Sequence, residues 1–460
     1  MAEGSAAKAT LSIDPNVKLS HVPDDFMGLS YESGQLAYPD FFSDDNTSLV
    51  DLFARLSPAG VLRLGGNLSE FTVWSDEDPV TPPQTGGLVG PDPGVRVPRT
   101  FTITPKAIRN LKTFLKATGW TCIYGLNLGG GTVEQALAEG GYVAKTLGPL
   151  LQYVQFGNEP DLFKHHDEGD KRWTFEEYLA KWKTFRAAFH EKLPGVAVAG
   201  PDTAFNQAWV TSFCEAAPKE VVAVTSHYYA EGPPTDPKMT IDFLLHPGKM
   251  FESSCRKAME TAKAAGLPFR MAEGNSCFNA GKPGVSDTFA SALWAGDYCL
   301  QMASLGCVGV NLHSGANGPY SPIVGSALTG ISVRPEFYGL MVAQEFAGHT
   351  MRATKLDAGD ANVTAYAARV EEEKNLVAIF NKDARDVEVS ITVTAGNFKS
   401  GDLQRLVGPS IDSKGGITYG GAGVGHEGEF RPKEFETVRM HHGEMVVRMP
   451  GYSAAVIRQS

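Results

Sequence analysis

The sequence predicts an α/β protein in which a (β/α)8 barrel, the TIM-barrel architecture, is joined to an all-β sandwich. A strand-then-helix rhythm repeats eight times between residues 26 and 345, which is typical of βαβ units in a parallel barrel. After residue 345 the pattern changes to alternating strands without helices, which is typical of an antiparallel sandwich. A chain of 460 residues is also longer than one hydrophobic core commonly serves. We therefore expect a barrel over 26–345 and a sandwich over 8–25 and 346–460.

The eight barrel strands are expected at short runs of apolar and β-branched residues, each followed by a turn with glycine or a polar residue. Such runs suit a parallel sheet that is covered on both faces. Their predicted positions are 26–32, 60–66, 121–129, 153–159, 196–202, 222–229, 269–275 and 309–315.

The helices between these strands carry start signals and apolar stripes. Thr174 and Glu177 fit a capping box, and Thr132 and Gln135 form a similar start after the third strand. An apolar stripe at steps of four, three and four follows the first of these signals, at Tyr178, Trp182, Phe185 and Phe189. The stripe is interpreted as core packing against the barrel, in preference to an aromatic platform for a ligand.

The sandwich strands are predicted at 362–370, 375–381, 386–393, 444–449 and 453–459. Residues 9–15 near the N-terminus also read as a strand and have no helix after them, so we expect this strand to pair with the sandwich. The glycine-rich segment 420–428 lacks the full G-x-G-x-x-G spacing and follows no strand-to-helix turn. A nucleotide loop is therefore disfavoured there.

Composition excludes several function classes. The net charge of −11 comes without any run of basic residues, which argues against nucleic acid as a partner. No stretch approaches the roughly 18 apolar residues of a membrane span. The six cysteines lack zinc-ligand spacing, so they are expected to be buried thiols. The start MAEGSAAKAT lacks the features of a signal peptide, which suggests either a cytoplasmic protein or a mature form given a new initiator Met.

Polar residues stand at the carboxyl ends of the predicted barrel strands, where barrel enzymes place their active sites. Those expected around one pocket are Glu32, Asn67, Asn158, Glu159, His227, Tyr229, Glu273, Asn311 and His313. Because side chains alternate along a strand, Gly157 should share a face with Glu159 and leave room beside it. By the same rule Arg63, Gly65 and Asn67 should share a face, as should His227 and Tyr229.

The pocket is thus predicted to hold two carboxyl groups in different surroundings. Arg63 and Tyr229 would keep Glu273 ionised, whereas Glu159 has no obvious cationic partner in the sequence and burial should raise its pKa. One acid and one anion are what glycosidic bond cleavage requires. The alternative is that both glutamates only form ion pairs with neighbouring strands. Two carboxylates suffice without a metal or cofactor, and neither the His165, His166 and Asp167 loop nor the distant His227 and His313 forms a convergent metal site.

Motifs around these residues resemble a known enzyme family. NEP at 158–160, followed 114 residues after Glu159 by Glu273, resembles the retaining glycoside hydrolases of clan A. The segments RLGGN (63–67), QFGNEPDLF (155–163), VTSHYY (224–229) and RMAEGNS (270–276) resemble family 79, the heparanase and β-glucuronidase family, and within it the bacterial exo-β-glucuronidases. The similarity covers essentially the whole chain, including a sandwich built from both termini.

The resemblance implies that Glu159 is the acid/base and Glu273 the nucleophile. It also implies that Asn158 binds the sugar 2-hydroxyl, that Tyr229 hydrogen-bonds the nucleophile and that Tyr320 contacts the carboxylate of a uronic acid. The remaining residues expected to bind substrate or support the site are Glu32, for a ring hydroxyl such as O4, together with Asn67, Arg63 and His227.

The family contains both chain-cutting and end-cutting enzymes. Binding a sulfated chain needs basic clusters, and this sequence has only isolated basic pairs. The long segments 76–99 and 230–248 could close one side of the pocket, or be surface insertions only. The resulting hypothesis is a retaining exo-β-glucuronidase, acting on glycosides or glycans with terminal glucuronic acid, secreted or periplasmic as in the family. The alternatives are a clan A β-glycosidase for a neutral sugar and a carbohydrate-binding protein without activity.

Overall fold

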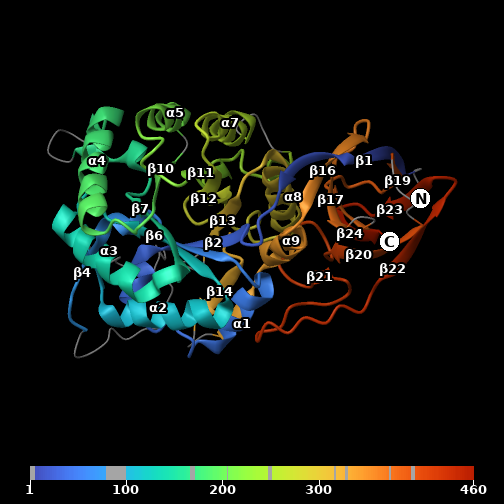
Figure 1. The fold of residues 1–460 in the computed structure, drawn as a ribbon. Coiled ribbons are helices and arrows are strands. Elements are labelled where there is room, and N and C mark those ends of the chain that lie inside the picture. The colour runs from blue at the N-terminus through green and yellow to red at the C-terminus, as the bar shows by residue number, and fades with distance from the viewer. Residues whose placement is uncertain are drawn as a thin grey trace.

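The computed structural model of the chain describes residues 6–78, 100–165, 171–204, 206–246, 251–314, 318–326, 330–371, 374–394 and 399–459. Two bodies lie side by side: a barrel surrounded by helices, and a sheet at which both labelled chain ends lie (Figure 1).

Eight parallel strands close into a barrel, so the predicted fold class is confirmed. β13 pairs with β2 and completes the ring. In barrel order the strands are β2 (Met27–Glu32), β3 (Val61–Gly65), β6 (Thr121–Leu126), β7 (Leu151–Phe156), β10 (Val198–Thr203), β11 (Val224–Glu231), β12 (Phe269–Cys277) and β13 (Gly309–His313). Each overlaps a run that the sequence predicts. Since all eight are parallel, their carboxyl ends open onto the same face.

Helices and short elements connect these strands. The helices are α1 (Thr47–Leu56), α2 (Pro105–Thr118), α3 (Val133–Leu147), α4 (Phe175–Lys192), α5 (Gln207–Ala216), α6 (Ile241–Leu245), α7 (Lys257–Ala264), α8 (Phe289–Leu305) and α9 (Pro335–Gln344). The short helical turns are η1 (Ser33–Ala37), η2 (Asn67–Phe71), η3 (Gly148–Leu150), η4 (Pro160–Leu162) and η5 (Phe251–Arg256). The small strand pairs are β4 (Thr72–Trp74) with β5 (Phe101–Ile103), β8 (Lys164–His165) with β9 (Lys171–Arg172), and β14 (Ile323–Ser326) with β15 (Gly330–Val333).

Helix α4 begins with the predicted capping box. Thr174 Oγ1 accepts the backbone N–H of Glu177, and the Glu177 carboxylate accepts the backbone N–H of Thr174. The predicted stripe is buried, and three of its rings, Trp182, Phe185 and Phe189, surround Phe156 at centroid distances of 4.9 to 6.1 Å. The aromatic stripe is therefore core. The Thr132 and Gln135 capping box is present as well.

The second body is a ten-stranded sheet. Its strands are β1 (Ala7–His21), β16 (Thr350–Asp357), β17 (Val363–Glu371), β18 (Lys374–Asn381), β19 (Val387–Val393), β20 (Ser400–Val407), β21 (Thr418–Tyr419), β22 (Glu436–His441), β23 (Glu444–Met449) and β24 (Ser453–Gln459). The expected pairing of the N-terminal strand with this sheet is present, because β1 lies between β16 and β19.

The sheet departs from a purely antiparallel pattern, since β1 runs parallel to β19. It also curls back on itself, because β24 pairs with both β18 and β20. An apolar core that includes Leu11, Ile379, Val389 and Val447 fills the inside. The exact domain boundaries, 26–345 for the barrel, stay a prediction.

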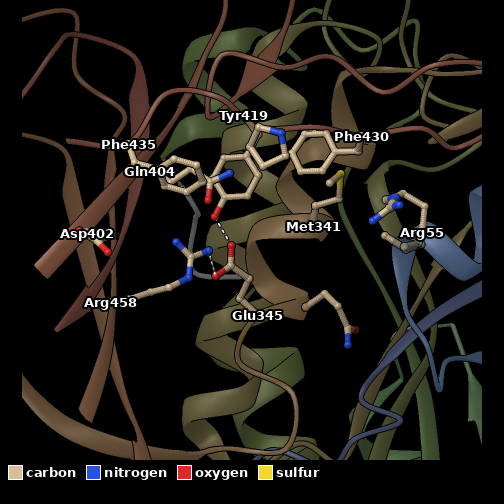
Figure 2. Close-up of a pocket in the computed structure, with 12 residues that line it drawn as sticks. Arg55, Met341, Glu345, Asp402, Gln404, Tyr419, Phe430, Phe435 and Arg458 are labelled. Atoms are coloured by element: carbon tan, nitrogen blue, oxygen red, sulfur yellow. Dashed lines mark hydrogen bonds and ion pairs between the residues drawn. The ribbon is translucent and has the colours of Figure 1, made fainter. Parts of the chain in front are cut away.

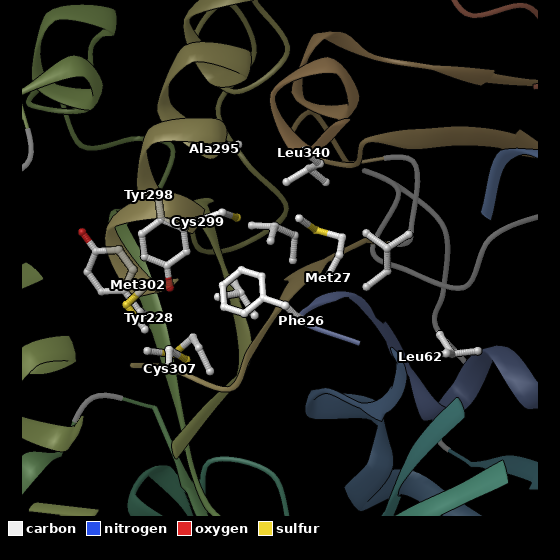
Figure 3. Close-up of a cluster of buried hydrophobic side chains, with 14 of the residues drawn as sticks. Phe26, Met27, Leu62, Tyr228, Ala295, Tyr298, Cys299, Met302, Cys307 and Leu340 are labelled. Carbon is white, nitrogen blue, oxygen red and sulfur yellow. The ribbon is translucent and has the colours of Figure 1, made fainter. Parts of the chain in front are cut away.

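Helix α8 joins the two bodies and is buried along nearly its whole length, as a helix apolar on all sides should be. Asp297 on this helix forms a buried ion pair with Lys382 and accepts hydrogen bonds of 2.6 Å from Thr364 and Tyr366 of the sheet. Side chains of α8 and α9 also pack with the barrel strands, as Figure 3 shows for Phe26, Met27, Leu62, Tyr228, Ala295, Tyr298, Cys299, Met302, Cys307 and Leu340.

All six cysteines are buried, as the sequence predicts, and none forms a disulfide with another described residue. Within the described ranges, none of the helices has the length and apolar character that crossing a bilayer would take.

Candidate active site

Arg63, on β3, lies at the centre of a polar cluster at the carboxyl ends of the barrel strands. It is fully buried, so its charge must be balanced locally. Its side-chain hydrogen bonds reach Ser30, Gln155, Asn158, Asp202 and Glu273. The predicted neighbour Gly65 faces the same side, because a Cβ there would stand 2.3 Å from the guanidinium carbon. Glycine at this position thus makes room for the arginine.

Glu159 follows the strand rather than ending it. β7 stops at Phe156, and the backbone then turns through Gly157 at φ +83° and Glu159 at φ +51°. The left-handed region is uncommon for a non-glycine residue and is often found at functional sites. The prediction that Gly157 leaves room beside Glu159 is wrong, because a Cβ on Gly157 would instead meet Leu128 at 3.1 Å. The turn breaks the alternation on which that prediction rested.

The two predicted carboxyl groups face each other. One oxygen of Glu159 and one of Glu273 lie within 4.8 Å. The two residues are only 9% and 5% exposed, although they are separated by 114 positions in the chain. Carboxyl groups about 5 to 5.5 Å apart are typical of retaining glycosidases, whereas inverting enzymes need about 6.5 to 9.5 Å. The spacing fits a mechanism in which one carboxylate attacks the sugar directly.

Glu273 is held as an anion. Tyr229 donates a hydrogen bond of 2.7 Å to Oε1 and Arg63 one of 2.5 Å to Oε2, and His313 Nδ1 lies 3.6 Å from Oε2. Burial by itself raises the pKa of this carboxyl, but the charges of His313, His227 and Arg63 outweigh it and hold the pKa well below its usual range. This agrees with the expectation from the sequence.

Glu159 is the more basic of the two carboxyl groups. Burial raises its pKa, as expected, and the negative charge of Glu273 adds to the effect. The sequence suggested no cationic partner, and here the structure differs: His227 Nδ1 lies 3.0 Å from Glu159 Oε1. This contact moderates the rise in pKa. One carboxyl oxygen is thus committed to His227, and the other is left to carry the proton.

His227 is itself a cation. Burial opposes its charge, but Asp202 and Glu273 outweigh burial and raise the pKa of His227 to about 10. Its two nitrogens therefore both carry protons, one directed at Glu159 and the other, 3.2 Å away, at Asp202 Oδ1. The imidazolium links the candidate acid to a buried anion.

The same geometry bears on metal binding. One ligand atom from each of Glu159, His227 and Glu273 lies within 4.8 Å of the other two, a spacing that an ion can bridge. Histidine binds metals through an unprotonated nitrogen, and both nitrogens of His227 hold protons at neutral pH. The three groups are therefore better described as a hydrogen-bonded acid–base cluster. Of the other candidate ligands, His166 and Asp167 lie outside the described residues.

Asp202, at the end of β10, was missed from the sequence. It accepts hydrogen bonds from Arg63 at 2.6 Å and Gln155 at 2.5 Å, and its backbone carbonyl accepts the N–H of Glu159 at 2.9 Å. The Arg63 and His227 charges overcome burial and lower its pKa. The signal was available, because Asp202 closes the fifth predicted strand (196–202) just as Glu159 closes the fourth (153–159).

Asn158 and Asn67 meet beside the carboxyl pair. Asn158 Oδ1 accepts a hydrogen bond from Arg63 at 2.7 Å, and its Nδ2 donates to Asn67 Oδ1 at 3.1 Å. Glu70, a second missed residue, accepts the backbone N–H groups of Asn158 at 3.1 Å and Gly129 at 2.5 Å. Burial raises the pKa of Glu70 to about 7. Glu70 thus fixes the turn that presents Asn158 and its neighbour.

Glu32 and Tyr320 also lie near the pair. Glu32 Oε2 accepts the N–H of Leu68 at 2.7 Å, and its Oε1 lies 3.7 Å from His313. The Tyr320 ring is 6.4 Å from that of Tyr229 and 5.9 Å from that of His313. Glu32 and Tyr320, which were predicted to contact the substrate, thus each lie beside a residue that also contacts the nucleophile, His313 or Tyr229.

One predicted pocket residue lies elsewhere. Asn311 hydrogen-bonds Arg270 at 2.7 Å and the backbone carbonyls of Leu29 and Val61, inside the barrel wall. Its role is structural. Most of the segment 76–99, which was predicted to close the pocket or to be a surface insertion, lies outside the described residues. The segment 230–248 contains α6.

Comparisons with known proteins agree with this geometry. Residues 178–299, which include His227, Tyr229 and Glu273, match the model of "Glycosyl hydrolase family 79, N-terminal domain". A curated "Beta-glucuronidase" of Aspergillus niger is 26% identical over 92% of this chain and 87% of its own length. These matches support an assignment to glycoside hydrolase family 79. Another curated "Beta-glucuronidase", of Neurospora crassa, is 27% identical over 73% of this chain and 66% of the relative.

Solved structures share the fold of this chain. A 4-O-α-L-rhamnosyl-β-D-glucuronidase from Fusarium oxysporum 12S superposes with a TM-score of 0.77 and 18% identity, over 97% of this chain and 99% of the other. A GH51 arabinofuranosidase from Xanthomonas axonopodis pv. citri gives a TM-score of 0.72 and 16% identity, over 99% and 100%. At these identities the likeness concerns the fold alone.

Proposed function

We propose that this chain is a family 79 enzyme, a retaining exo-β-glucuronidase that removes terminal β-linked glucuronic acid from glycosides or glycan chains. The observation that carries the proposal is the pair of buried carboxyl groups, within 4.8 Å of each other, with one pKa raised and the other lowered. A neutral acid and an anion at this separation are the two groups that a double displacement requires.

In the first step, Glu159 donates its proton to the glycosidic oxygen while Glu273 attacks the anomeric carbon. The bond to the leaving group breaks as the bond to the Glu273 carboxylate forms, giving a covalent glycosyl-enzyme and a protonated leaving group. In the second step the now ionised Glu159 removes a proton from water, which attacks the same carbon and releases Glu273 as the carboxylate. Glu159 ends protonated, ready for another cycle.

The neighbouring residues support this chemistry. Tyr229 and Arg63 keep Glu273 ionised and aligned through their hydrogen bonds of 2.7 and 2.5 Å. Asn158, which is fixed by Arg63 and Asn67, is assigned to the sugar 2-hydroxyl. This contact strengthens as charge develops at the anomeric carbon.

Glucuronic acid is proposed as the sugar because both curated relatives are named β-glucuronidases. Tyr320 is assigned to the uronate carboxylate and Glu32 to a ring hydroxyl. Both lie on the same side as His313, which is near Glu32 and Glu273. The hydroxyl of Tyr320 can donate to a carboxylate without adding a charge that would compete for Glu273.

Rates on 4-nitrophenyl β-D-glucuronide and 4-nitrophenyl β-D-glucoside test the sugar. We expect the glucuronide to be preferred, with Tyr320→Phe reducing that preference. A faster rate on the glucoside would contradict the assignment and favour a β-glycosidase for neutral sugars. Binding of glycosides with no turnover would instead indicate a carbohydrate-binding protein.

The roles of the two carboxyl groups are tested by Glu159→Gln and Glu273→Gln. The first variant should lose about 100- to 10,000-fold on substrates with poor leaving groups, yet keep a fast first step on activated aryl glucuronides. The second should lose both steps on every substrate. Equal losses in both variants on both substrate types would contradict the assignment.

A further inference from the structure

A cavity of about 480 Å³ lies at the junction of the barrel and the C-terminal sheet and shares no lining residue with the carboxyl pair. Helix α1, helix α9 and strands β20, β21 and β24 contribute to its wall, together with the segment 430–435 (Figure 2). This volume is in the range of small-ligand sites. The catalytic chemistry derived above makes no use of it.

The amide side chain of Gln404 reaches this cavity with hydrogen-bonding capacity to spare. Gln404 is only 3% exposed and lines the cavity, and its side chain makes no hydrogen bond to any residue that the structure describes. Buried polar groups are nearly always hydrogen-bonded, so this amide calls for an occupant that both donates and accepts.

One wall of the cavity is already fixed. Glu345 accepts hydrogen bonds from the Tyr419 hydroxyl and from the Arg458 guanidinium (Figure 2). The Glu345 carboxylate thus balances the Arg458 charge within the wall of the cavity. The remaining charged groups, Arg55 and Asp402, are opposite in sign. The cavity therefore favours no ionic ligand of either charge.

The other wall is aromatic. Phe430 stacks on Tyr419 with the rings 6.2 Å apart and 15° from parallel, and Arg55 covers it at 6.0 Å. Phe435 is different, because it is 53% exposed at the cavity rim. The exposed ring and the Gln404 amide together combine an apolar surface with a hydrogen-bonding group that can both donate and accept.

We propose that this cavity is a second carbohydrate site, which binds a neutral sugar ring. Hydroxyl groups of the sugar donate to and accept from Gln404, and the apolar C–H face of the ring packs on Phe435. A sugar suits the site because its hydroxyls match the amide and because it carries no charge.

This inference rests on the proposed function in one respect: neutral residues of the same glycan that carries the terminal glucuronic acid are the ligands it would serve. Holding one part of a glycan here raises the effective concentration of its ends near the enzyme. The site would act by retention of substrate, without taking part in bond cleavage.

The test uses the full chain carrying Glu273→Gln, so that turnover does not consume the probes. Neutral cello-, xylo- and galacto-oligosaccharides are titrated and followed by saturation-transfer NMR and calorimetry, with Phe435→Ala and Gln404→Leu as site variants. Val446→Ala is the matched control, because Val446 is a similarly exposed apolar residue (49%) on β23 of the same sheet. We expect at least one probe to bind saturably, about tenfold or more weaker in both site variants, and unchanged in the control.

Failure of every neutral probe to bind, or binding that Phe435→Ala and Gln404→Leu leave unchanged, would overturn the proposal. A glucuronate anion that binds here more tightly than the neutral probes would overturn it as well. These outcomes are independent of the proposed activity, which is measured on 4-nitrophenyl glucuronide with the unmodified carboxyl pair.

Discussion

Replacing Tyr229 with phenylalanine removes one atom from the candidate site and keeps the ring. The lost hydroxyl donates a hydrogen bond of 2.7 Å to Glu273 Oε1. The packing of the ring on Tyr320 and Phe278, both 6.4 Å away, needs no hydroxyl. The variant therefore removes the hydrogen bond to the nucleophile, together with the contact that the same hydroxyl makes with the side chain of Tyr320.

The size of the effect follows from the charge on the acceptor. A hydrogen bond to an ionised group contributes about 1.5–3 kcal/mol, and about 1.36 kcal/mol corresponds to a factor of ten in rate. In the second step Glu273 leaves as a carboxylate, and this charge is stabilised by Tyr229 as it develops. Tyr229→Phe should therefore slow release of the sugar by about 10- to 150-fold.

Stopped-flow kinetics on an activated aryl glucuronide measures this step. We expect a burst of the aryl alcohol followed by a slower steady state, with KM lowered together with kcat because the covalent intermediate accumulates. The acidic limb of kcat/KM should also move to higher pH, since Tyr229 helps to lower the pKa of Glu273 and the anion is needed for attack.

Tyr153→Phe is the matched control. Tyr153 lies on β7 of the same barrel and is 6% exposed, and its hydroxyl has no hydrogen-bond partner among the described residues. Its loss should leave kcat and the pH profile unchanged. A Tyr229→Phe enzyme whose kcat stays within about threefold of the original, below the range given above, with an unmoved acidic limb, would refute the reasoning.

Three further predictions concern the neighbours of the pair and the joint between the two bodies. His227→Gln removes a hydrogen bond that lowers the pKa of Glu159. Glu159 should therefore stay protonated to higher pH, and the alkaline limb of kcat/KM should move to higher pH; an unmoved limb would count against this contact. Glu70→Gln leaves one acceptor for two backbone N–H groups, which should weaken the positioning of Asn158 and Glu159 by about 1–3 kcal/mol. The resulting loss of rate should be larger for substrates with poor leaving groups, and an equal loss of rate for all leaving groups would argue against a positioning role. Lys382→Met leaves the Asp297 carboxylate buried without its ion pair, which should lower the free energy of unfolding in urea by about 3–5 kcal/mol; an unchanged midpoint would contradict it.

Local patterns were sufficient for the barrel. Apolar runs followed by turn residues located all eight strands, and the capping box at Thr174 located the start of α4. In a parallel barrel the active-site residues lie at the carboxyl ends of the strands. This rule depends only on strand direction, so it predicted that Glu159 and Glu273 share one pocket. These features could therefore be predicted from the order of residue types along the chain.

The side-chain contacts between different barrel strands could not be predicted from the sequence. The pairing of His227 with Glu159 depends on the register between strands, and so do the hydrogen bonds that Arg63 donates to five side chains. The reversed backbone at Gly157 and Glu159 also broke the alternation assumed there. Asp202 was a different case, since the rule that found Glu159 applies to it equally.

The central claim is that the two carboxyl groups act on one anomeric carbon from within 4.8 Å of each other. Proton NMR of the first sugar released from a β-glucuronide, recorded before mutarotation, tests it most directly. Retention gives β-glucuronic acid first, with the α anomer growing in later. Appearance of the α anomer first would mean inversion, which needs a wider separation and a water between the groups, and would contradict the account.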